Sequence, residues 1–138
     1  MTSYKIETIE GVGAKYAKIL RKNNIASTKA LLARGATKKG RKETAKETGI
    51  DETLILKWCN MCDLMRVKGI AEEYSELLEV AGVDTVKELR KRKPNNLHQA
   101  MSDANSAKKK KLVRQVPGLK QVENWVAHAK TLDAVMKY

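Results

Sequence analysis

Aromatic residues and cysteines are scarce in this sequence of 138 residues: it has no Phe, only 4% aromatics and two Cys. Its core must therefore rest on Leu, Ile, Val, Ala and Met. No apolar run approaches the roughly 20 residues that a membrane-spanning helix requires. The first residues lack the basic and apolar segments of a secretory signal, and two cysteines cannot build a disulfide framework. We therefore expect a cytoplasmic protein that neither enters a membrane nor is exported.

Acidic residues are also few, 16 against 28 Lys and Arg, which gives a net charge of +12. Residues 1–46 hold 12 basic and 3 acidic side chains, residues 47–86 hold 3 and 9, and residues 87–138 hold 13 and 4. One Lys-rich stretch is usually a solvated helix face, but several that converge on one side attract a polyanion. Four basic clusters favour a polyanionic partner, and they lie at residues 15–22, 38–42, 90–93 and 108–114.

The sequence predicts helices throughout, because apolar residues recur at helical spacing and no segment alternates with the period of a strand. Glycines at positions 35, 49 and 82 follow predicted helices, where a left-handed residue is common. We expect all three to have that conformation. Side chains suited to the start of a helix are expected to act as N-caps at Thr37, Asp51, Asp84 and Ser106.

An internal repeat organises the chain. Residues 9–32, IEGVGAKYAKILRKNNIASTKALL, align without a gap with residues 67–90, VKGIAEEYSELLEVAGVDTVKELR, at an offset of 58. Trp58 aligns with Trp125 at the larger offset of 67. We therefore predict two tandem helical repeats packed together, at residues 1–65 and 66–138, with a basic insertion near residues 108–114 in the second.

A Gly-apolar-Gly turn between two helical stretches opens the first repeat, in IETIEGVGAKYAKIL. We expect Gly11 and Gly13 to supply backbone angles closed to other residues, Val12 to insert into the core, and Ala17 to let the helices approach. The free N–H groups of such a turn and of the helix after it form an anion site. The pattern resembles the helix-hairpin-helix motif of DNA-repair and replication proteins. That resemblance implies an all-α fold of helix-hairpin-helix-like (SAM-like) repeats whose hairpin holds a DNA phosphate, with a monovalent cation at its carbonyls.

The second repeat departs from this pattern. Ala71 replaces the second glycine, and Glu72 and Glu73 would repel a phosphate. We therefore expect its hairpin to be structural or to bind protein. A third partial match, VRQVPGLKQV, also lacks the second glycine. Even for the first hairpin the sequence leaves two alternatives open, phosphate binding and a purely structural turn.

Other chemistry is less well supported. Cys59 and Cys62 lie inside a predicted helix without further metal ligands, so we interpret them as small core residues. Trp58 and Trp125 occupy equivalent apolar positions, which favours a core role over base stacking. His98 and His128 have no evident partner. No nucleophile with a base and no carboxylate cluster suited to a metal is evident, so we predict no enzyme, no metal site and no other cofactor.

Residues 6 to about 132 as a whole resemble the domain-of-unknown-function family 4332. The resemblance rests on GVGAKYAKIL, GATKKGRKETAKETGI, LILKWCNMCDLMRVKGI, AGVDTVKELR, PNNLHQAM and VPGLKQVENWV. It implies paired helix-hairpin-helix-like units and carries over no catalytic residue.

The sequence thus predicts a module that binds nucleic acid without sequence specificity, at the backbone of a duplex, with DNA favoured over RNA. If about four phosphates are neutralised, the logarithm of the affinity falls against log salt with a slope near −3.6. The alternative is a protein-interaction or self-association scaffold, in which the acidic residues 72–79 dock on a basic cluster. The predicted nucleic-acid contacts are Gly11, Val12, Gly13, Ala14, Lys15, Lys18, Lys38, Lys39, Arg41 and Lys42.

Overall fold

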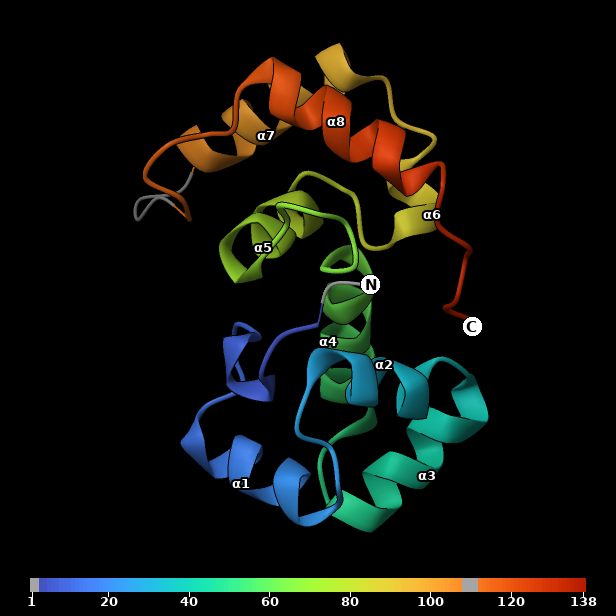
Figure 1. Cartoon of the computed structure of the whole chain (residues 1–138). Coiled ribbons are helices and arrows are strands. Elements are labelled where there is room, and N and C mark those ends of the chain that lie inside the picture. The colour runs from blue at the N-terminus through green and yellow to red at the C-terminus, as the bar shows by residue number, and fades with distance from the viewer. Residues whose placement is uncertain (1–2, 108–111) are drawn as a thin grey trace.

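A computed structural model describes residues 3–107 and 112–138, except for the side chain of Glu72. Within those ranges the chain is all-helical and has no strand (Figure 1), which confirms the all-α class, while the tandem helix-hairpin-helix-like repeats stay a prediction. The predicted insertion falls partly on residues 108–111, which lie outside the described residues. The helices are the 3-10 turn η1 (Ile6–Thr8) and the α-helices α1 (Ala14–Lys22), α2 (Thr28–Gly35), α3 (Lys38–Thr48), α4 (Glu52–Leu64), α5 (Glu72–Val80), α6 (Val86–Leu89), α7 (Pro94–Ser106) and α8 (Leu119–Ala129).

Two of the four predicted N-caps are confirmed. Thr37 and Asp51 accept backbone N–H groups from the first turns of α3 and α4, at 3.0 and 2.7 Å. The other two predictions are wrong. Helix α6 begins one residue later than expected, after Thr85, and Ser106 is the last residue of α7 rather than the start of a helix.

Glycines end helices at two of the three predicted positions. Gly49 and Gly82 have φ of +73° and +98°, the left-handed region that glycine enters without strain. The prediction for Gly35 is wrong, because it is the last helical residue of α2. A Cβ on Gly35 would lie 2.2 Å from Cys59 Sγ, so this glycine allows α2 to pack closely against α4.

The buried apolar side chains form two clusters, one in each half of the chain. The first draws on residues 6–62 together with Met136, and the second on residues 64–129. Helix α4 contributes to both, since Cys62 belongs to the first cluster and Leu64 to the second. The division into two units between residues 65 and 66 stays a prediction. Apart from Met136, the first cluster ends at Cys62 on α4 and the second begins at Leu64, close to that boundary.

A buried ion pair lies where α4 ends. Arg66 donates from Nε and Nη2 to Asp63 Oδ1 at 3.0 and 2.5 Å, and both side chains are almost fully buried. Asp63 Oδ2 also accepts the N–H of Val86 at 2.9 Å, and Arg66 Nη2 donates to the carbonyl of Asp133 at 2.8 Å. Asp63 therefore supplies the N-cap of α6 that Asp84 was expected to provide, and the pair ties α4, α6 and the segment after α8 together.

Residues 133–138 return from the second half to the first. Met136 joins the first apolar cluster, and the N–H of Lys137 donates to the carbonyl of Ala36 at 2.7 Å. The hydroxyl of Tyr138 donates to Asn60 Oδ1 at 2.7 Å. The segment therefore lies against the α2–α3 junction and α4 (Figure 1).

Residues that the two sequence alignments pair, at offsets of 58 and 67, have matching geometry in the two halves. Gly11 and Gly69 have φ of +91° and +92°. In each half a tyrosine after the hairpin lies with its ring centroid 5.3 Å from that of a tryptophan, and these pairs are Tyr16–Trp58 and Tyr74–Trp125. Both tryptophans are buried, in the core role that the sequence favoured.

Candidate nucleic-acid interface

Hairpin one, residues 9–13, is a tight turn whose apolar tip points inward. Val12 is buried, as expected, and its N–H donates to the carbonyl of Ile9 at 3.1 Å. That amide is therefore engaged within the turn, and the prediction that Val12 presents a free donor is corrected. The turn depends on Gly11, whose φ of +91° strains any residue with a Cβ and which lies against Trp58.

The start of α1 is exposed and carries free backbone donors. The N–H groups of Gly13, Ala14 and Lys15 donate to no acceptor among the described residues, and these three residues are exposed. No acidic side chain lies in the first turn and none caps it. The first N–H groups of a helix favour an anion through their partial positive charge. This end of α1 is therefore electrostatically suited to a phosphate.

Gly13 has no conformational need to be glycine, contrary to the sequence-based expectation. Its φ of −80° and ψ of −179° are open to any residue. A Cβ built on it meets no atom within 4 Å, so the space beside it is open. What glycine provides here is the absence of a Cβ, which lets a ligand approach the backbone N–H groups closely.

Three lysines lie along α1, from its first turn to its last residue. Lys15, Lys18 and Lys22 are exposed, and no ion pair between described side chains engages them. Lys18 and Lys22 lie one turn apart and line an open groove of about 520 Å³ on α1. Lys22 was missing from the predicted contacts, although its i,i+4 spacing from Lys18 places both on one face.

The acid nearest to this groove is already paired. Arg21 Nη2 lies 2.6 Å from Glu7 Oε1, and this hydrogen bond holds the pKa of Glu7 below its ordinary value. The Glu7 carboxylate therefore opposes an incoming phosphate less than an isolated carboxylate would. We call the backbone donors of residues 13–15 together with Lys15, Lys18 and Lys22 the hairpin-one surface.

Hairpin two, residues 67–71, has the same turn with different surroundings. The N–H of Lys68 donates to His128 Nδ1 at 3.1 Å, so α8 covers part of the turn and His128 has a partner that the sequence did not reveal. Ala71 replaces Gly13 at the start of the next helix, and Glu73 is exposed in its first turn. The two hairpins thus differ in two ways. A side chain, that of Ala71, covers the backbone where Gly13 leaves it open, and the nearby charge is negative at hairpin two and positive at hairpin one.

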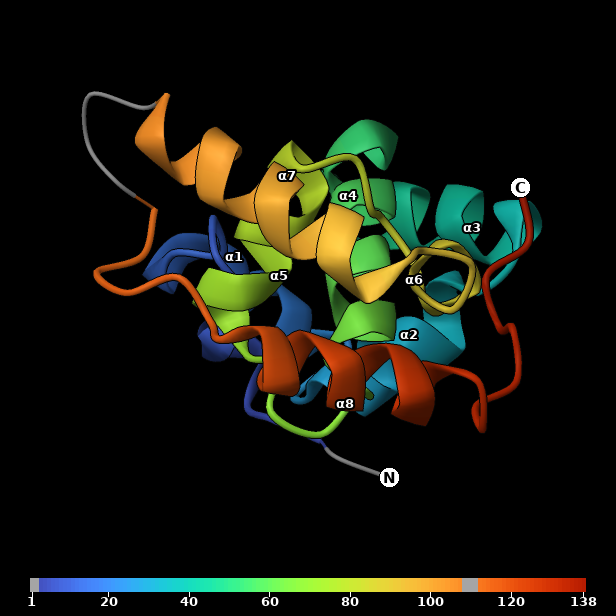
Figure 2. The same cartoon turned by 90° about the horizontal axis from the view of Figure 1, so that it is seen from above.

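The predicted contacts on α3 do not join the hairpin-one surface. Lys38, Lys39 and Lys42 are exposed on α3, whereas hairpin one leads into α1. In two perpendicular views, α1 and α3 lie on opposite sides of this half of the molecule (Figures 1 and 2). The ten predicted residues therefore do not form one site.

Arg41 is not available to a phosphate, and its prediction is corrected. It is 3% exposed, and its guanidinium donates to the carbonyls of Gly35 and Ala36 at 2.9 and 3.4 Å and to that of Lys137 at 2.9 Å. The first two carbonyls belong to the C-terminal end of α2, where a cation is favoured. Arg41 therefore stabilises the end of α2 and holds residues 137–138 in place.

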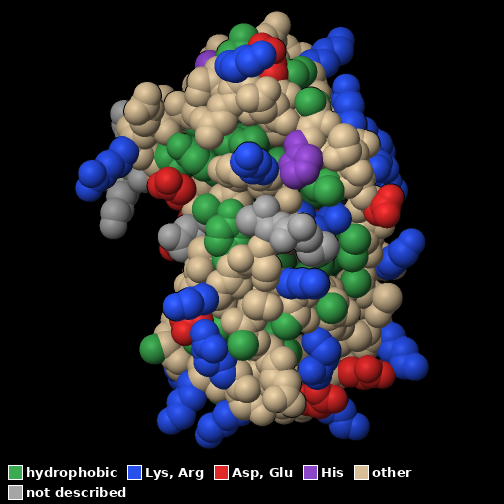
Figure 3. Space-filling view, in the orientation of Figure 1, with side chains coloured by type: hydrophobic (Ala, Val, Ile, Leu, Met, Phe, Trp, Pro, Cys, Tyr) green, Lys and Arg blue, Asp and Glu red, His purple; other side chains and the backbone are tan. Residues whose placement is uncertain are grey.

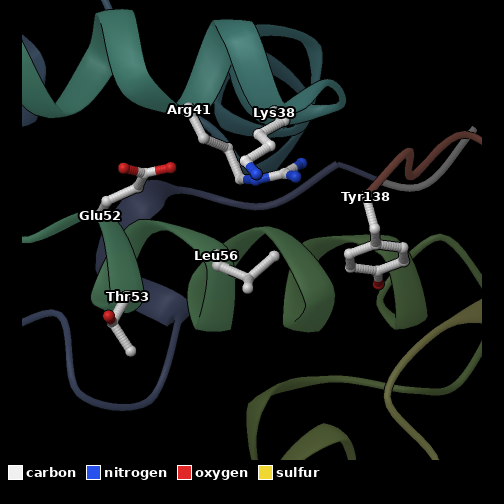
Figure 4. Close-up of a pocket in the computed structure, with 6 residues that line it drawn as sticks. All are labelled: Lys38, Arg41, Glu52, Thr53, Leu56 and Tyr138. Atoms are coloured by element: carbon white, nitrogen blue, oxygen red, sulfur yellow. The ribbon is translucent and has the colours of Figure 1, made fainter.

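A pocket of about 320 Å³ lies beside Arg41, between α3 and α4 (Figure 4). The ring of Tyr138 stands at one end of it, with the Arg41 guanidinium carbon 5.6 Å from the ring centroid. The Lys38 and Arg41 nitrogens lie side by side, and Glu52 faces the opposite end. The Arg41 donors are already bonded to backbone carbonyls, one of them that of Lys137, and its guanidinium packs near the Tyr138 ring. We therefore interpret this pocket as the place where residues 137–138 pack against α3 and α4. Its lining residues are Lys38, Arg41, Glu52, Thr53, Leu56 and Tyr138.

Both cysteines are buried in the first apolar cluster. Burial raises the pKa of the Cys59 thiol to about 12, an effect that the nearby Arg41 only partly offsets. Burial also raises the pKa of Cys62 well above its ordinary value, and Cys59 and Asp63 add to the rise. Neutral, enclosed thiols are neither nucleophiles nor metal ligands, which agrees with the core role inferred from the sequence.

No group of three or more His, Cys, Asp and Glu side chains within residues 3–107 and 112–138 is placed to hold a metal ion. None of the helices described there combines the length and apolar character needed to cross a bilayer.

Comparison with protein-family models gives one match, the Domain of unknown function DUF4332, over residues 10–132. The chain belongs to the DUF4332 family. This match confirms the resemblance seen in the sequence, and it extends from hairpin one to just beyond α8. No curated protein and no solved structure matches the chain. The DUF4332 assignment therefore identifies the relatives of this chain without naming an activity, and its function has to be argued from its surfaces.

Proposed function

We propose that this DUF4332 protein binds nucleic-acid duplexes through their phosphate backbone, without sequence specificity, at the hairpin-one surface. The observation that carries the proposal is the exposed, unengaged set of N–H groups at Gly13, Ala14 and Lys15, next to three unpaired lysines. Backbone amides at a helix start and lysines are the groups that proteins use to hold phosphates.

The turn itself gives no means of reading a base sequence. Direct readout needs side chains such as Arg, Lys, Asn or Gln that reach base edges in a groove. Residues 11–14, in hairpin one and at the first position of α1, are Gly-Val-Gly-Ala, with the valine buried, so none carries a side-chain hydrogen-bonding group, and we assign the lysines of α1 to phosphates. Contacts limited to phosphates position a protein on a duplex and are indifferent to its sequence. A preference for DNA over RNA, and a monovalent cation at the hairpin carbonyls, stay predictions.

The proposal is tested by mobility shifts with a 30-base-pair DNA duplex and a matching RNA duplex over a salt series. With about four phosphates neutralised, the slope of log affinity against log salt is near −3.6. Replacing Lys15 and Lys18 by Glu is expected to bring that slope to about −1.8 or shallower, because two of those contacts are lost. The melting temperature should change little, because both side chains are exposed.

The matched control is the double variant Lys120→Glu with Lys130→Glu, which has the same change in charge at an exposed lysine on α8 and at the exposed lysine directly after it. Helix α8 lies at the opposite end of the molecule from α1 (Figure 1). The control variant should retain the slope of the wild type. If both double variants lose affinity equally, only net charge matters and the assigned site is wrong. A chain that shifts no duplex at low salt, yet forms dimers that salt dissociates, would contradict the proposal and support the alternative of a self-association scaffold.

A further inference from the structure

We infer that α3 carries a second polyanion surface and that one chain bridges two nucleic-acid duplexes. The inference rests on the proposed function and extends it from binding one duplex to holding two together. Its starting point is the separation of the predicted contacts into two groups on different helices. We call the second group the α3 surface, and its members are Lys38, Lys39, Lys42, Lys46 and Lys137.

The α3 surface is defined by spacing and by one distant contact. Residues 38, 42 and 46 follow each other at intervals of four, so they share one face of the helix. Lys137 lies beside them because its N–H donates to Ala36, directly before α3, and its carbonyl accepts from Arg41. All five lysines are exposed, and no ion pair between described side chains involves any of them.

The acids near the α3 surface leave it positively charged. Glu47 is engaged by Arg34 in an ion pair. Glu43 is exposed between the lysines, and Glu52 faces the neighbouring pocket from α4. The five lysines outnumber these acids, so the net charge of the α3 surface is positive. Lysine is depleted at the centre of protein–protein interfaces, whereas phosphate contacts depend on it. The chemistry of this surface therefore fits a nucleic-acid backbone better than a protein partner.

The beginnings of α1 and α3 lie on opposite sides of this half (Figures 1 and 2), with α2 and α4, which pack on each other and on α3, in its body. The ends of the two helices approach each other, because Arg34 donates to the carbonyl of Asn23 directly after α1 and pairs with Glu47 on α3. The space-filling view shows Lys and Arg side chains along both edges of the lower half of the molecule (Figure 3). A straight duplex at the beginning of α1 therefore leaves the beginning of α3, with Lys38, Lys39 and Lys42, free to take a second duplex.

The amount of bridging depends on protein concentration in a way that the binding of a single duplex does not. At low protein concentration each chain joins two duplexes. When protein is in excess, every duplex is saturated separately and the bridges disappear by mass action. Raised salt weakens both contacts at once, so bridging falls more steeply with salt than the binding of one duplex.

The experiment measures capture of a fluorescent 30-base-pair duplex by an identical duplex fixed on beads, alongside a mobility shift on the same samples. The wild type is expected to capture the free duplex at low concentration and to lose capture in excess. Lys39→Glu with Lys42→Glu reverses two of the five lysine charges of the α3 surface, and Lys15→Glu with Lys18→Glu reverses two of the three lysine charges of the hairpin-one surface. Each variant is expected to shift single duplexes still and to reduce capture at least fivefold, while Lys120→Glu with Lys130→Glu captures like the wild type.

The outcomes separate the two proposals. Mobility shifts without capture by the wild type overturn bridging and leave the proposed function standing. Capture that survives Lys39→Glu with Lys42→Glu also overturns it, because the bridge then comes from self-association or from another cluster, such as residues 90–93. A wild type that shifts no duplex overturns both proposals. Equal melting temperatures of the three variants, measured in the same buffer, show that any loss reflects the surface and not the fold.

Discussion

Gly13 and Ala71 occupy the same position, directly before the helix that follows each hairpin, and both have extended backbone. Their φ angles are −80° and −114°. The fold therefore accepts alanine at this position, and the space beside Gly13 is open. The glycine in the first hairpin leaves the backbone accessible, whereas the turn itself does not require it.

Gly13→Ala should therefore separate binding from stability. Alanine is a poorer N-cap than glycine by ~0.5–1 kcal/mol, but it restricts the unfolded chain by ~0.4–1 kcal/mol, so the net change in stability is small. Affinity for a duplex should fall about tenfold, which corresponds to one charge-assisted hydrogen bond of ~1.5 kcal/mol. The control is Ala71→Gly, which should gain no binding because Glu73 remains. Unchanged affinity in Gly13→Ala, measured by mobility shift, would show that no ligand approaches this backbone.

Arg41→Met should lower stability and leave the binding mode intact. The change removes the donor to three carbonyls, and each buried acceptor left unsatisfied costs ~1–3 kcal/mol. Urea denaturation should show a loss of at least ~2 kcal/mol. Under conditions where the variant is folded, the salt slope of duplex binding should match that of the wild type. A stable variant whose slope is shallower by about 0.9 would instead make Arg41 a phosphate contact.

Gly35→Ala should destabilise the first half, because its Cβ would lie 2.2 Å from Cys59 Sγ. Forced overpacking in a core costs ~1–3 kcal/mol. Cys59→Ala removes the sulfur, so the double variant Gly35→Ala with Cys59→Ala should be more stable than the sum of the two single losses predicts. Thermal melting of the four proteins measures this coupling. Strict additivity would mean that the Gly35–Cys59 contact does not set the distance between α2 and α4.

The two thiols should resist modification in the native protein and react after unfolding. A chromogenic disulfide reagent at pH 8 should label neither Cys59 nor Cys62 until denaturant is added, because both are buried and protonated. Fast labelling of the native protein would contradict their core placement.

Stability should also fall at alkaline pH. In the native state the pKa of Cys59 is raised to about 12, above its ordinary value of about 8.5. The contribution of the neutral thiol is therefore complete below about pH 8.5 and is lost as the pH rises toward 12. Urea midpoints at pH 8 and pH 10 measure this fall. Replacing both cysteines by Ala should make the fall shallower, and an equal fall in that variant would assign it to other groups.

Helix positions and several helix ends were accessible from the sequence, because their causes are local. Thr37 and Asp51 act on amide groups two or three residues away, and Gly49 and Gly82 adopt φ values that their own lack of a Cβ permits. Asp84 failed as a predicted cap for the opposite reason. The carboxylate that caps α6 is Asp63, 23 residues before the amide it accepts, and no local pattern reveals that pairing.

For the candidate site, the sequence located hairpin one and its lysines, but it could not group the clusters in space. Lys15 and Lys18 share a face of α1 through helical spacing alone. Whether Lys38, Lys39 and Lys42 would join them depended on how α1 and α3 pack around α2 and α4. The sequence also gave Arg41 the same weight as its lysine neighbours. Only its burial against the end of α2 and against Lys137, 96 residues away, assigns it a structural role.

By itself, then, the sequence determined the helical content, the membership in DUF4332 and the excess of positive charge, since these follow from composition and short-range patterns. The tertiary structure alone decided which amides stay free, which cations are buried and which basic clusters face the same side. Those properties depend on contacts between residues far apart in the chain, and such contacts exist only once the two apolar clusters have packed.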